Sequence, residues 1–567
     1  MTPLDNQVGP GAARSGSSGL GASVAMSNLL AGAEPTAPRC LGELIARLEA
    51  SGQLRTVRGP ETLGAVGGAR EPSIGALQIR GVAFDSRLVH ASNLFVAVSG
   101  AHADGHDYVA AAADLGAVAA VVERPAPGVA LLQIVVDDTR RALGIAAAWW
   151  YGDPSRDIGI VGVTGTDGKT TTAFLAAAVL KAAGISTGLV TTAEVAVGSL
   201  RTANPEHVTT PEAPELQRML RAMVRAGNQA AIVETTSHGL ALHRVAEVAY
   251  DVAVFTNLSH EHLELHGTFE AYRDAKLGLF RRLGDDGPAK HLTRPWPRTA
   301  LVNVDDEAAP LFTAAAREAG ARVLTYGEAN RADVRATSVV ESAASLHVDV
   351  LTPRWSGPVE LLLTGRFNVQ NALAAVALGE ALELEQGQVC DGLAGARGVP
   401  GRMERVDCGQ PFGVIVDYAH SPASLKTVLD VLAPVASAGG GGLIAVFGSA
   451  GERDVRKRPM MGRVAGERCR LVVVTDEDPR GEDSETILAE IAAGAADAGM
   501  RRGRDLLCIA DRRAAIEAAL ERAEPGDVVL LAGKGHEQTI IMGDGPRPWD
   551  ERSEAVRALG RLGYISE

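Results

Sequence analysis

The feature that most constrains the fold is an apolar run that leads through a glycine-rich turn into a helical pattern. The run IGIVGVTG begins at Ile158, and the segment TTAFLAAAVLKAAG follows the turn. A strand, a turn and a helix in this order form the basic unit of a parallel α/β sheet. Similar apolar runs follow at QAAIVET, VAVFTNL and TALVNVD. We therefore predict a parallel sheet here, with ligands bound beyond the carboxyl ends of its strands.

The turn itself has the residue types of a phosphate-binding loop. Backbone N–H groups at a helix N-terminus favour anionic oxygens, a lysine adds a mobile positive charge, and a threonine hydroxyl can ligate Mg²⁺. Val163 stands where the common GxxxxGK spacing has glycine, so the loop is a GxxGKTT variant. A plain glycine turn is the alternative, and the strand, the Lys-Thr pair and the helix together favour a nucleotide loop. The candidate residues are Gly165, Thr166, Asp167, Gly168, Lys169, Thr170 and Thr171.

Two further strand ends carry polar residues that suit a metal and phosphate site. Glu234 ends the strand of VETTSHGL, where a carboxylate can complete the coordination of Mg²⁺. The segment NLSHEHLELHG from Asn257 brings three histidines and two acids, of which at most one histidine is expected to ligate so hard a cation. A solvated polar loop is the alternative for that segment. A nucleotide loop alone fits a kinase, a switch GTPase and a ligase equally well.

The length of the chain indicates several domains. At about 150 residues per domain, 567 residues give three to four. Residues 1–38 are rich in Gly, Ala, Ser and Pro and are expected to form a disordered tail. Four apolar strands with polar or glycine-rich ends (PFGVIVDYAH, GLIAVFGSAG, CRLVVVTDE and DVVLLAGKGHE) indicate a second, doubly wound sheet near the C-terminus. We predict α/β domains over 39–156, 157–398 and 399–567.

Charge and composition exclude several classes of partner. The 55 basic and 69 acidic residues leave a formal charge of −14, so the electrostatic footprint of a nucleic-acid-binding protein is missing. No apolar run approaches the ~18 residues of a membrane span, and the N-terminus lacks a signal-peptide pattern. Five cysteines without a CxxC pair indicate a reducing compartment. We expect a cytoplasmic monomer with small-molecule substrates.

Only seven of the 55 basic residues are lysines, among them Lys169, Lys276 and Lys534. Arginine is permanently charged, whereas lysine can lose its proton and act as a nucleophile. The lysines that remain are therefore candidates for chemistry that arginine cannot perform, although an ordinary surface position is the alternative for each.

Seven segments resemble the Mur ligase family and occur in its order: TGTDGKTT, ETTSHGL, NLSHEHLELHGTFEAYRDAKLGLF, GRFNVQNALAA, GRMERV, DYAHSPASL and GKGHE. The resemblance runs from about Gly81 to the C-terminus and is greatest to the tripeptide synthetases of the family. It implies a central P-loop ATPase-like parallel sheet, flanked by an N-terminal UDP-binding α/β domain and a C-terminal Rossmann-like domain that receives the amino acid. It also implies that ATP phosphorylates a carboxylate, and that an amine attacks the acyl phosphate. The expected reaction adds a diamino acid to UDP-MurNAc-L-Ala-D-Glu.

The resemblance also assigns roles to individual residues. Lys169 and Thr170 would hold the γ-phosphate and Mg²⁺, Glu234 and His262 would ligate Mg²⁺, and Lys276 would be carbamylated by CO₂ to help bind a second magnesium. The remaining ATP contacts would be Asn368, Asn371, Arg402 and Asp417. The UDP-substrate contacts would be Phe84, Ser86, Ala101, His102, Ala103, Thr209, Thr210, Thr236 and Arg244. Val208 and Leu242 depart from the polar residues that can stand at these positions in the family.

The amino-acid pocket implied by the resemblance contains Arg453, Glu477, Asp478, Pro479, Arg480, Gly533 and Glu537. Enzymes that add meso-diaminopimelate usually carry Asp-Asn-Pro-Arg, whereas this chain has Glu-Asp-Pro-Arg. Arg480 favours meso-diaminopimelate, because a buried arginine without an acid to meet is costly. Asp478 would instead welcome the side-chain ammonium of L-lysine or L-ornithine. The alternatives of another class are a P-loop kinase or ATPase, an impaired Mur-like binding protein, and a folylpolyglutamate or D-Ala-D-Ala-adding ligase.

Overall fold

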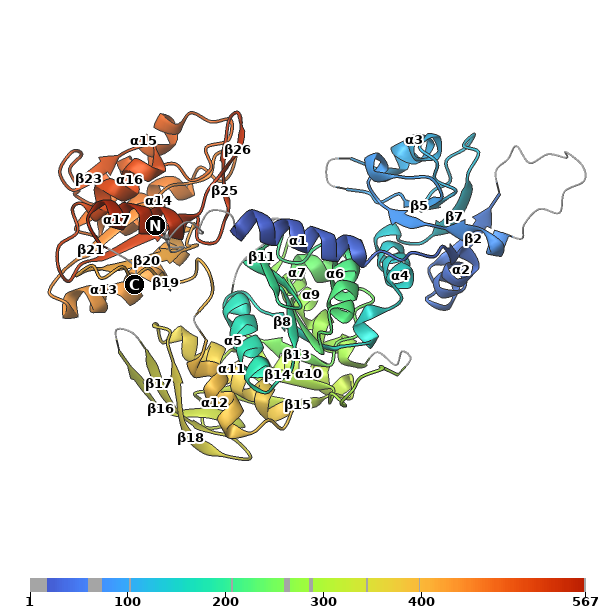
Figure 1. Cartoon of the computed structure of the whole chain (residues 1–567), viewed down its shortest axis with the longest axis horizontal. Helices are drawn as coiled ribbons and strands as arrows, with labels where there is room; N and C mark the ends of the chain where they lie inside the picture. Colours follow the sequence, from blue (N-terminus) through green and yellow to red (C-terminus); the bar gives the residue numbers. More distant parts are fainter. Residues whose placement is uncertain are drawn as a thin grey trace, which may run out of the picture.

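Three helix-covered β-sheets follow one another along the chain, and Figure 1 shows the first and the last on opposite sides of the middle one. The computed structural model describes residues 18–59, 74–100, 103–204, 208–259, 266–284, 289–342, 345–396 and 398–564. Within these residues, no helix is both long and apolar enough to cross a membrane.

The first sheet has the strand order β2-β7-β6-β5-β4, in which only β2 is antiparallel to its neighbour. Helix α4 is capped by the Asp138 side chain and ends at Gly152, which has a positive φ of 71°. Its apolar residues share one core with those of α2. The elements are α2 (Leu41–Ala50), β2 (Leu54–Arg58), β4 (Gly81–Ala83), β5 (Asn93–Val96), α3 (Val109–Asp114), β6 (Ala119–Val122), β7 (Leu132–Val136) and α4 (Thr139–Tyr151).

The central sheet has eleven strands in the order β11-β10-β9-β12-β8-β13-β14-β15-β16-β17-β18. Its middle is parallel, as the buried apolar runs predicted, and antiparallel pairs add strands at both edges. The strands are β8 (Gly159–Thr164), β9 (Thr187–Val190), β10 (Glu194–Val197), β11 (Leu200–Ala203), β12 (Ala230–Glu234), β13 (Val252–Phe255), β14 (Thr299–Asn303), β15 (Arg322–Gly327), β16 (Val334–Glu341), β17 (Leu346–Leu351) and β18 (Ser356–Leu361).

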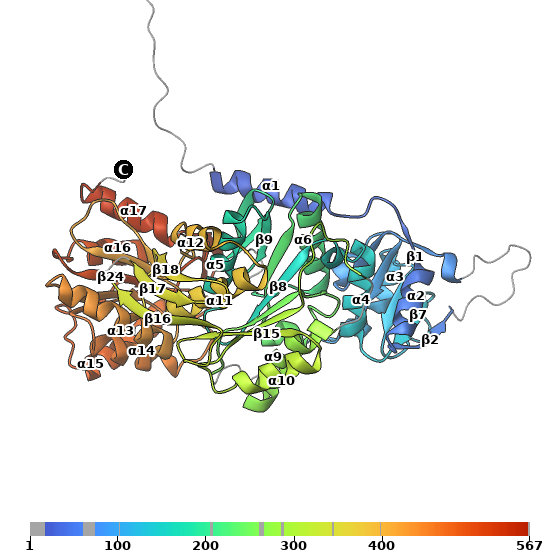
Figure 2. The same cartoon turned by 90° about the horizontal axis from the view of Figure 1, so that it is seen from below.

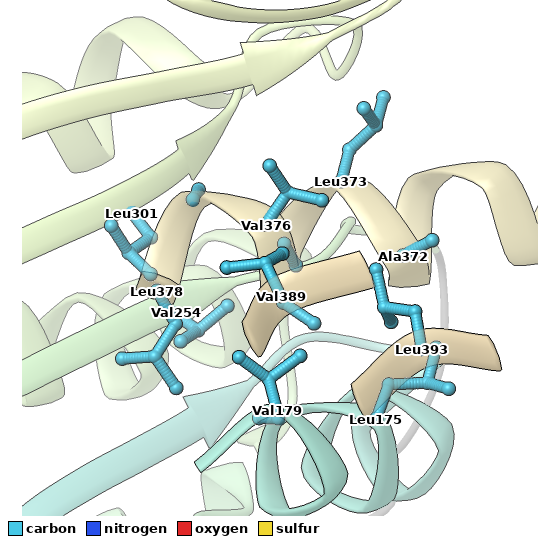
Figure 3. Packing of buried hydrophobic residues seen from close by; sticks show 14 of the residues in the cluster. Leu175, Val179, Val254, Leu301, Ala372, Leu373, Val376, Leu378, Val389 and Leu393 are labelled. Atoms are coloured by element: carbon cyan, nitrogen blue, oxygen red, sulfur yellow. The ribbon is translucent and has the colours of Figure 1, made fainter. Parts of the chain in front are cut away.

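Helices cover both faces of this sheet and create two separate cores. One face carries α5 (Lys169–Ala182), α11 (Phe367–Ala381) and α12 (Gln386–Ala394). Figure 3 shows Val179 of α5 packed against Val389 of α12, beneath Val376 of α11. The other face carries α6 (Ala213–Arg225), α7 (Ser237–Ala241), α9 (Phe269–Arg281) and α10 (Ala309–Glu318). Because α11 packs on α5, its sequence FNVQNALAAVALGEA is buried on nearly all sides.

The third sheet has the order β19-β20-β24-β21-β22-β23, and all its strands except β19 are parallel. The elements are β19 (Glu404–Arg405), β20 (Gly413–Asp417), α13 (Pro422–Ala438), β21 (Leu443–Phe447), α14 (Lys457–Gly466), β22 (Leu471–Val474), α15 (Ser484–Asp497), β23 (Leu506–Cys508), α16 (Arg512–Leu520), β24 (Val528–Ala532) and α17 (Glu551–Arg561). A hairpin of β25 (Thr539–Met542) and β26 (Gly545–Pro548) follows β24.

The expected disordered tail over residues 1–38 is wrong from Ser18 onward. Residues 18–32 form helix α1 (Ser18–Gly32), which contacts β11 and α6 along the outside of the central sheet (Figure 2). Met26 and Ala33 are 5% and 0% exposed and belong to the core on that face. The small residues suggested a linker, but the Met and Leu side chains among them give this segment an apolar surface to bury. Residues 1–17 lie outside the described part of the chain.

Candidate active site

The phosphate loop lies between the end of β8 and the start of α5, where backbone geometry requires glycine at two positions. Gly165 and Gly168 have positive φ values of 150° and 78°. A Cβ atom on Gly165 would lie 1.9 Å from Thr256 Oγ1, and one on Gly168 would lie 2.3 Å from Asn371 Oδ1. Any side chain here would displace the loop, so both glycines hold the N-terminus of α5 open to a ligand.

The first residues of α5 connect the loop to the neighbouring strand β12. Lys169 Nζ donates to the Thr166 carbonyl at 2.6 Å, so the lysine folds over the loop. Thr170 Oγ1 donates to Glu234 Oε2 at 2.9 Å, and the backbone N–H of Thr192 donates to the same oxygen at 3.0 Å. Glu234 is 1% exposed. The parallel strands β8 and β12 thus bring the threonine and the carboxylate together, as their sequence positions predicted.

These two side chains fit a magnesium ion by the chemistry of their donors. A hydroxyl and a carboxylate oxygen within hydrogen-bond distance of each other can share one hard cation, which prefers oxygen ligands. His262, the third expected ligand, falls in 260–265, outside the described residues. In the described part of the chain, no group of three His, Cys, Asp or Glu side chains forms a metal cluster. A phosphate-bound magnesium needs no such cluster, because phosphate oxygens and water supply the other ligands.

Lys276 approaches the phosphate loop from α9. It is 2% exposed, and its Nζ donates to the Gly165 carbonyl at 2.6 Å. Nζ also lies 4.5 Å from the ring centroid of Tyr272, whose hydroxyl is 3.0 Å from Thr166 Oγ1. The structure therefore places this lysine beneath the loop and not on a helix surface.

The four expected ATP contacts outside the loop divide between two domains. On α11, Asn371 accepts from Thr172 Oγ1 at 3.1 Å and donates to Asn368 at 3.0 Å, so both asparagines lie beside the loop. Arg402 and Asp417 lie in the C-terminal domain. Asp417 accepts from the N–H groups of Met403 and Ala419, and burial raises its pKa.

The four threonine and arginine candidates for the UDP-substrate gather around the end of β12. Thr210 Oγ1 donates to the Glu234 carbonyl at 2.9 Å and lies 3.0 Å from Thr236 Oγ1, and Thr209 is bonded to Thr192. Arg244 donates to the Thr210 carbonyl and pairs with Glu212 at 2.7 Å. These residues therefore line the same strand end as the magnesium candidates.

The N-terminal candidates lie at the carboxyl ends of two adjacent parallel strands. Phe84 and Ser86 follow β4, and Ala103 follows β5. Phe84 packs against the domain core, and Ala103 is exposed. Ala101 and His102 lie outside the described residues. Nothing in the described contacts ties these positions to the threonines of the central domain.

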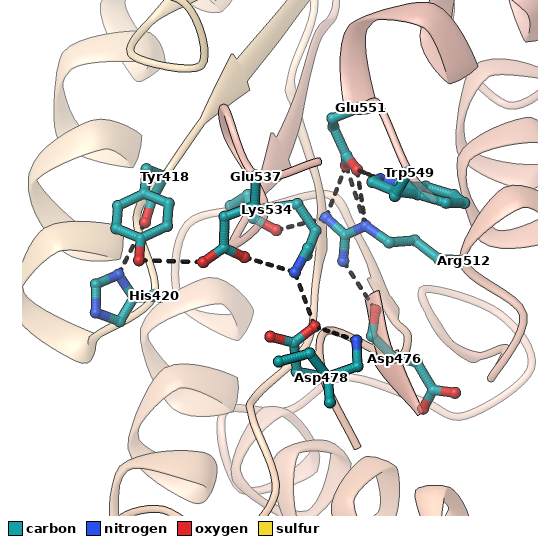
Figure 4. A network of polar contacts seen from close by, with 11 residues as sticks. Tyr418, His420, Asp476, Asp478, Arg512, Lys534, Glu537, Trp549 and Glu551 are labelled. Carbon is teal, nitrogen blue, oxygen red and sulfur yellow. Dashed lines mark hydrogen bonds and ion pairs between the residues drawn. The ribbon is translucent and has the colours of Figure 1, made fainter. Parts of the chain in front are cut away.

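In the C-terminal domain, the segments Glu477–Arg480 and Gly533–Glu537 follow β22 and β24 and meet above the sheet. Figure 4 shows Lys534 between two carboxylates: its Nζ lies 2.8 Å from Asp478 and 2.5 Å from Glu537. Glu537 also accepts from the Tyr418 hydroxyl at 3.4 Å. Asp478 accepts a second bond, at 2.9 Å, from the N–H of Ile541. The Asp478 carboxylate therefore has its partners within the protein. The sequence did not predict its pairing with Lys534.

Glu477 is the most buried acid among the expected amino-acid contacts. It is 6% exposed, its Oε2 has no hydrogen-bond partner, and a Cβ on Gly533 would lie 2.9 Å from that oxygen. Burial raises the pKa of Glu477, and the charges of Lys457, His420 and Lys534 oppose the shift. Arg480 holds a left-handed φ of 55° and follows Pro479, while Arg453 is exposed. An acid kept close to a glycine backbone suits an incoming ammonium group.

Sequence reasoning missed three residues that complete these contacts, besides Lys534. Tyr272 lies within a quoted segment and Thr192 lies outside all of them, and the roles of both depend on which strands and helices pack together. Arg512 begins α16, and no motif in the sequence singled out this arginine.

Three family models match consecutive parts of the chain: "Mur ligase family, catalytic domain" at 78–151, "Mur ligase middle domain" at 163–379 and "Mur ligase, glutamate ligase domain" at 401–535. Together with the phosphate loop and the three sheets, these matches define an ATP-dependent ligase. The chain belongs to the Mur ligase family.

Curated relatives match nearly the whole chain. The UDP-N-acetylmuramyl-tripeptide synthetase of Roseiflexus sp. (strain RS-1) is 48% identical over 495 residues, covering 86% of this chain and 96% of the relative. The UDP-N-acetylmuramoyl-L-alanyl-D-glutamate–2,6-diaminopimelate ligase of Geobacter metallireducens is 41% identical, covering 86% and 95%. A solved structure of a ligase with the latter name is 29% identical, has a TM-score of 0.61, and covers 88% of this chain and 98% of that one.

Proposed function

We propose that this ligase uses ATP to join a diamino acid to UDP-MurNAc-L-Ala-D-Glu, with meso-diaminopimelate as the favoured amino acid. The observation that carries the proposal is the pair of strand-end sites: Thr170 and Glu234 at the phosphate loop, and Glu477 with Glu537 around Lys534 in the C-terminal domain. The first suits a phosphate donor, and the second suits an amine. The names of the relatives support the same substrates.

In the first half of the proposed reaction, an oxygen of the D-glutamyl carboxylate attacks the γ-phosphorus and ADP leaves. Lys169 would exchange the Thr166 carbonyl for a phosphate oxygen, and Thr170 and Glu234, with His262, would hold Mg²⁺. Bound magnesium neutralises negative charge on the phosphate oxygens. Lys276, once carbamylated, would present anionic oxygens beside the loop for a second magnesium.

The central domain would also hold the acceptor. Arg244 pairs with Glu212 and can exchange that carboxylate for one of the substrate, while Thr209, Thr210 and Thr236 offer hydroxyls at the end of β12. Phe84, Ser86 and the 101–103 segment would contact the UDP end. The resulting acyl phosphate is positioned at the edge of the sheet from which the phosphate loop opens.

In the second half, the neutral amine attacks the acyl carbon, a C–N bond forms and the C–O bond to phosphate breaks. Phosphate leaves, and the nitrogen loses one proton to phosphate or solvent. The pairing of Asp478 with Lys534 favours meso-diaminopimelate, because the charge of the lysine weakens the repulsion between this aspartate and a distal carboxylate near Arg480. Glu477 and Glu537 would receive an ammonium. L-Lysine or L-ornithine remains the second candidate, since these acids also suit a side chain with only an ammonium.

The test is product formation from ATP, Mg²⁺, UDP-MurNAc-L-Ala-D-Glu and one amino acid at a time, followed by mass spectrometry. A tripeptide product with meso-diaminopimelate and little with L-lysine or L-ornithine supports the proposal. Products with lysine or ornithine alone would reverse the choice of amino acid. Phosphate release that needs no amino acid would indicate an ATPase. No product and no phosphate release with any of the three amino acids would indicate an impaired binding protein.

We also propose that the protein acts in the cytoplasm as a monomer without a nucleic-acid partner. The formal charge of −14 and the nucleotide substrates support this setting. Sedimentation at working concentration would test the monomer, with a dimer mass as the contrary result.

A further inference from the structure

A single buried arginine lies beneath both segments of the amino-acid pocket. Arg512 begins α16, its side chain is 1% exposed, and it donates to the Asp476 carbonyl at 3.0 Å and to the Ala532 carbonyl at 2.7 Å. Asp476 directly precedes Glu477, and Ala532 directly precedes Gly533. One guanidinium therefore binds the residues that directly precede both segments of the proposed pocket (Figure 4).

The two strands that Arg512 connects do not pair with each other. In the sheet order, β21 lies between β24 and β22, so no ladder hydrogen bond sets the distance between their carboxyl ends. Above the sheet, the Lys534–Asp478 ion pair joins the two segments again. The two segments are therefore connected twice, by the Arg512 guanidinium next to the strand ends and by the Lys534 ammonium farther from the sheet.

The charge of Arg512 is balanced by an equally buried partner. Glu551, whose side chain is 0% exposed, accepts from Arg512 Nη2 at 2.7 Å and from Nε at 2.9 Å, and it also accepts from Trp549 Nε1 at 2.6 Å. Burying such a pair removes both ions from water, so it contributes little to stability. The planar fork of arginine can reach two carbonyls and a carboxylate at once, which the point charge of lysine cannot do.

We infer that Arg512, held by Glu551, is a positioning residue for binding the diamino acid. It sets the separation of Glu477–Asp478 from Gly533–Lys534 and touches no substrate itself. This inference rests on the proposed function, because it takes these two segments as the amino-acid pocket.

The adjacent residue provides a matched control. Arg513 pairs with Glu554 at 2.8 Å and so joins the same helices, α16 and α17. Within the described part of the chain, the Arg513 side chain hydrogen-bonds to Glu554 alone, and it is 49% exposed. Arg513→Met therefore removes an ion pair between α16 and α17 and leaves the hydrogen bonds of Arg512 to the ends of β22 and β24 in place.

The experiment measures KM for the diamino acid, for ATP and for the UDP-substrate in the full-length wild type and in Arg512→Lys, Arg512→Met, Glu551→Gln and Arg513→Met, with the melting temperature of each. We expect KM for the diamino acid to rise at least tenfold in both Arg512 variants and severalfold in Glu551→Gln. The other two KM values should stay within twofold, and Arg513→Met should match the wild type.

The following results would overturn the inference. Equal rises in all three KM values, or unfolding of every Arg512 and Glu551 variant, would assign the pair a purely structural role. An Arg513→Met variant with the same KM defect would assign the effect to helix coupling. A wild type that uses no diamino acid would refute the proposed function, and the inference with it, whereas an active wild type with unaffected Arg512 variants refutes the inference alone.

Discussion

Lys276 occupies a place where a permanent charge could not serve the proposed chemistry. Its amine is buried against the phosphate loop, and carbamylation requires an amine that loses a proton and attacks CO₂. We predict that Lys276→Arg lowers the rate of amide formation at least a hundredfold while leaving the melting temperature within a few degrees of the wild type. Retained activity of this variant at ordinary CO₂ would contradict the carbamate.

A second prediction at the residue scale concerns the glycine that opens α5. Gly168→Ala places a Cβ 2.3 Å from Asn371 Oδ1 at a φ of 78°, so the loop must shift and kcat/KM for ATP should fall at least a hundredfold. Gly184, just beyond the other end of α5, has a φ of 74° with nothing within 4 Å of its Cβ position. Gly184→Ala should therefore cost about 1 kcal/mol of stability and leave kcat/KM unchanged. Equal kinetic defects in both variants would show that strain, and not the clash with Asn371, is responsible.

Glu477 gives a prediction about pH. Burial raises its pKa, so the folded protein holds this proton more tightly than the unfolded chain does. The ionised carboxylate therefore lowers stability as the pH rises above the ordinary glutamate pKa of about 4.3, and this cost is absent below it. Glu477→Gln should therefore melt above the wild type at pH 8, with the difference vanishing near pH 4.

The same variant should bind the diamino acid more weakly, because the substrate ammonium loses its anionic partner. Calorimetric melts across the pH range, with KM measured at pH 8, test both halves. A variant less stable than the wild type at pH 8 would show that the attraction of Glu477 to the charges of Lys457, His420 and Lys534 outweighs the cost of its burial.

At the scale of elements, helix α1 packs on the central domain, although its composition of small residues had predicted a disordered tail. Met26 is 5% exposed in the core on that face, whereas Val24 on the same helix is 60% exposed. We predict that Met26→Ala lowers the free energy of unfolding by about 2–3 kcal/mol, and that Val24→Ala changes it by less than about 0.5 kcal/mol. Thermal or urea melts measure both, and equal effects would mean that α1 does not dock in solution.

The sequence predicted the elements whose patterns are local, and missed those that depend on packing. The apolar runs and the GxxGKTT turn identified β8, α5 and the strand ends, because apolar periodicity and the position of glycine depend only on neighbouring residues in the sequence. Arg512 and Lys534 could not be assigned partners, since their contacts join segments separated by 36 and 56 residues. Lys534 was singled out by the scarcity of lysine and by its place in the GKGHE segment, and neither showed its partners. Helix α1 was missed because Gly, Ala and Ser fit a linker and a docked helix equally.

At the scale of the whole molecule, the residues of the proposed reaction are divided among domains. The phosphate loop, Glu234 and Lys276 lie in the central domain, whereas Asp417, Glu477 and the Lys534 pocket lie in the C-terminal one. The two are joined through a segment in which Gly398 and Gly401 have left-handed φ values of 88° and 66°. Since an amine must come within about 3–3.5 Å of the acyl carbon to react, we expect the C-terminal domain to close on the central domain during turnover.

The most direct test of this account follows the oxygen atoms of the D-glutamyl carboxylate. The wild-type protein is given UDP-MurNAc-L-Ala-D-Glu labelled there with isotopically heavy oxygen, together with ATP, Mg²⁺ and meso-diaminopimelate, and the phosphate and product are weighed by mass spectrometry. Passage through an acyl phosphate predicts that each amide formed transfers one labelled oxygen to the released phosphate. Unlabelled phosphate would contradict carboxylate activation by ATP, and with it the joint use of the two sites.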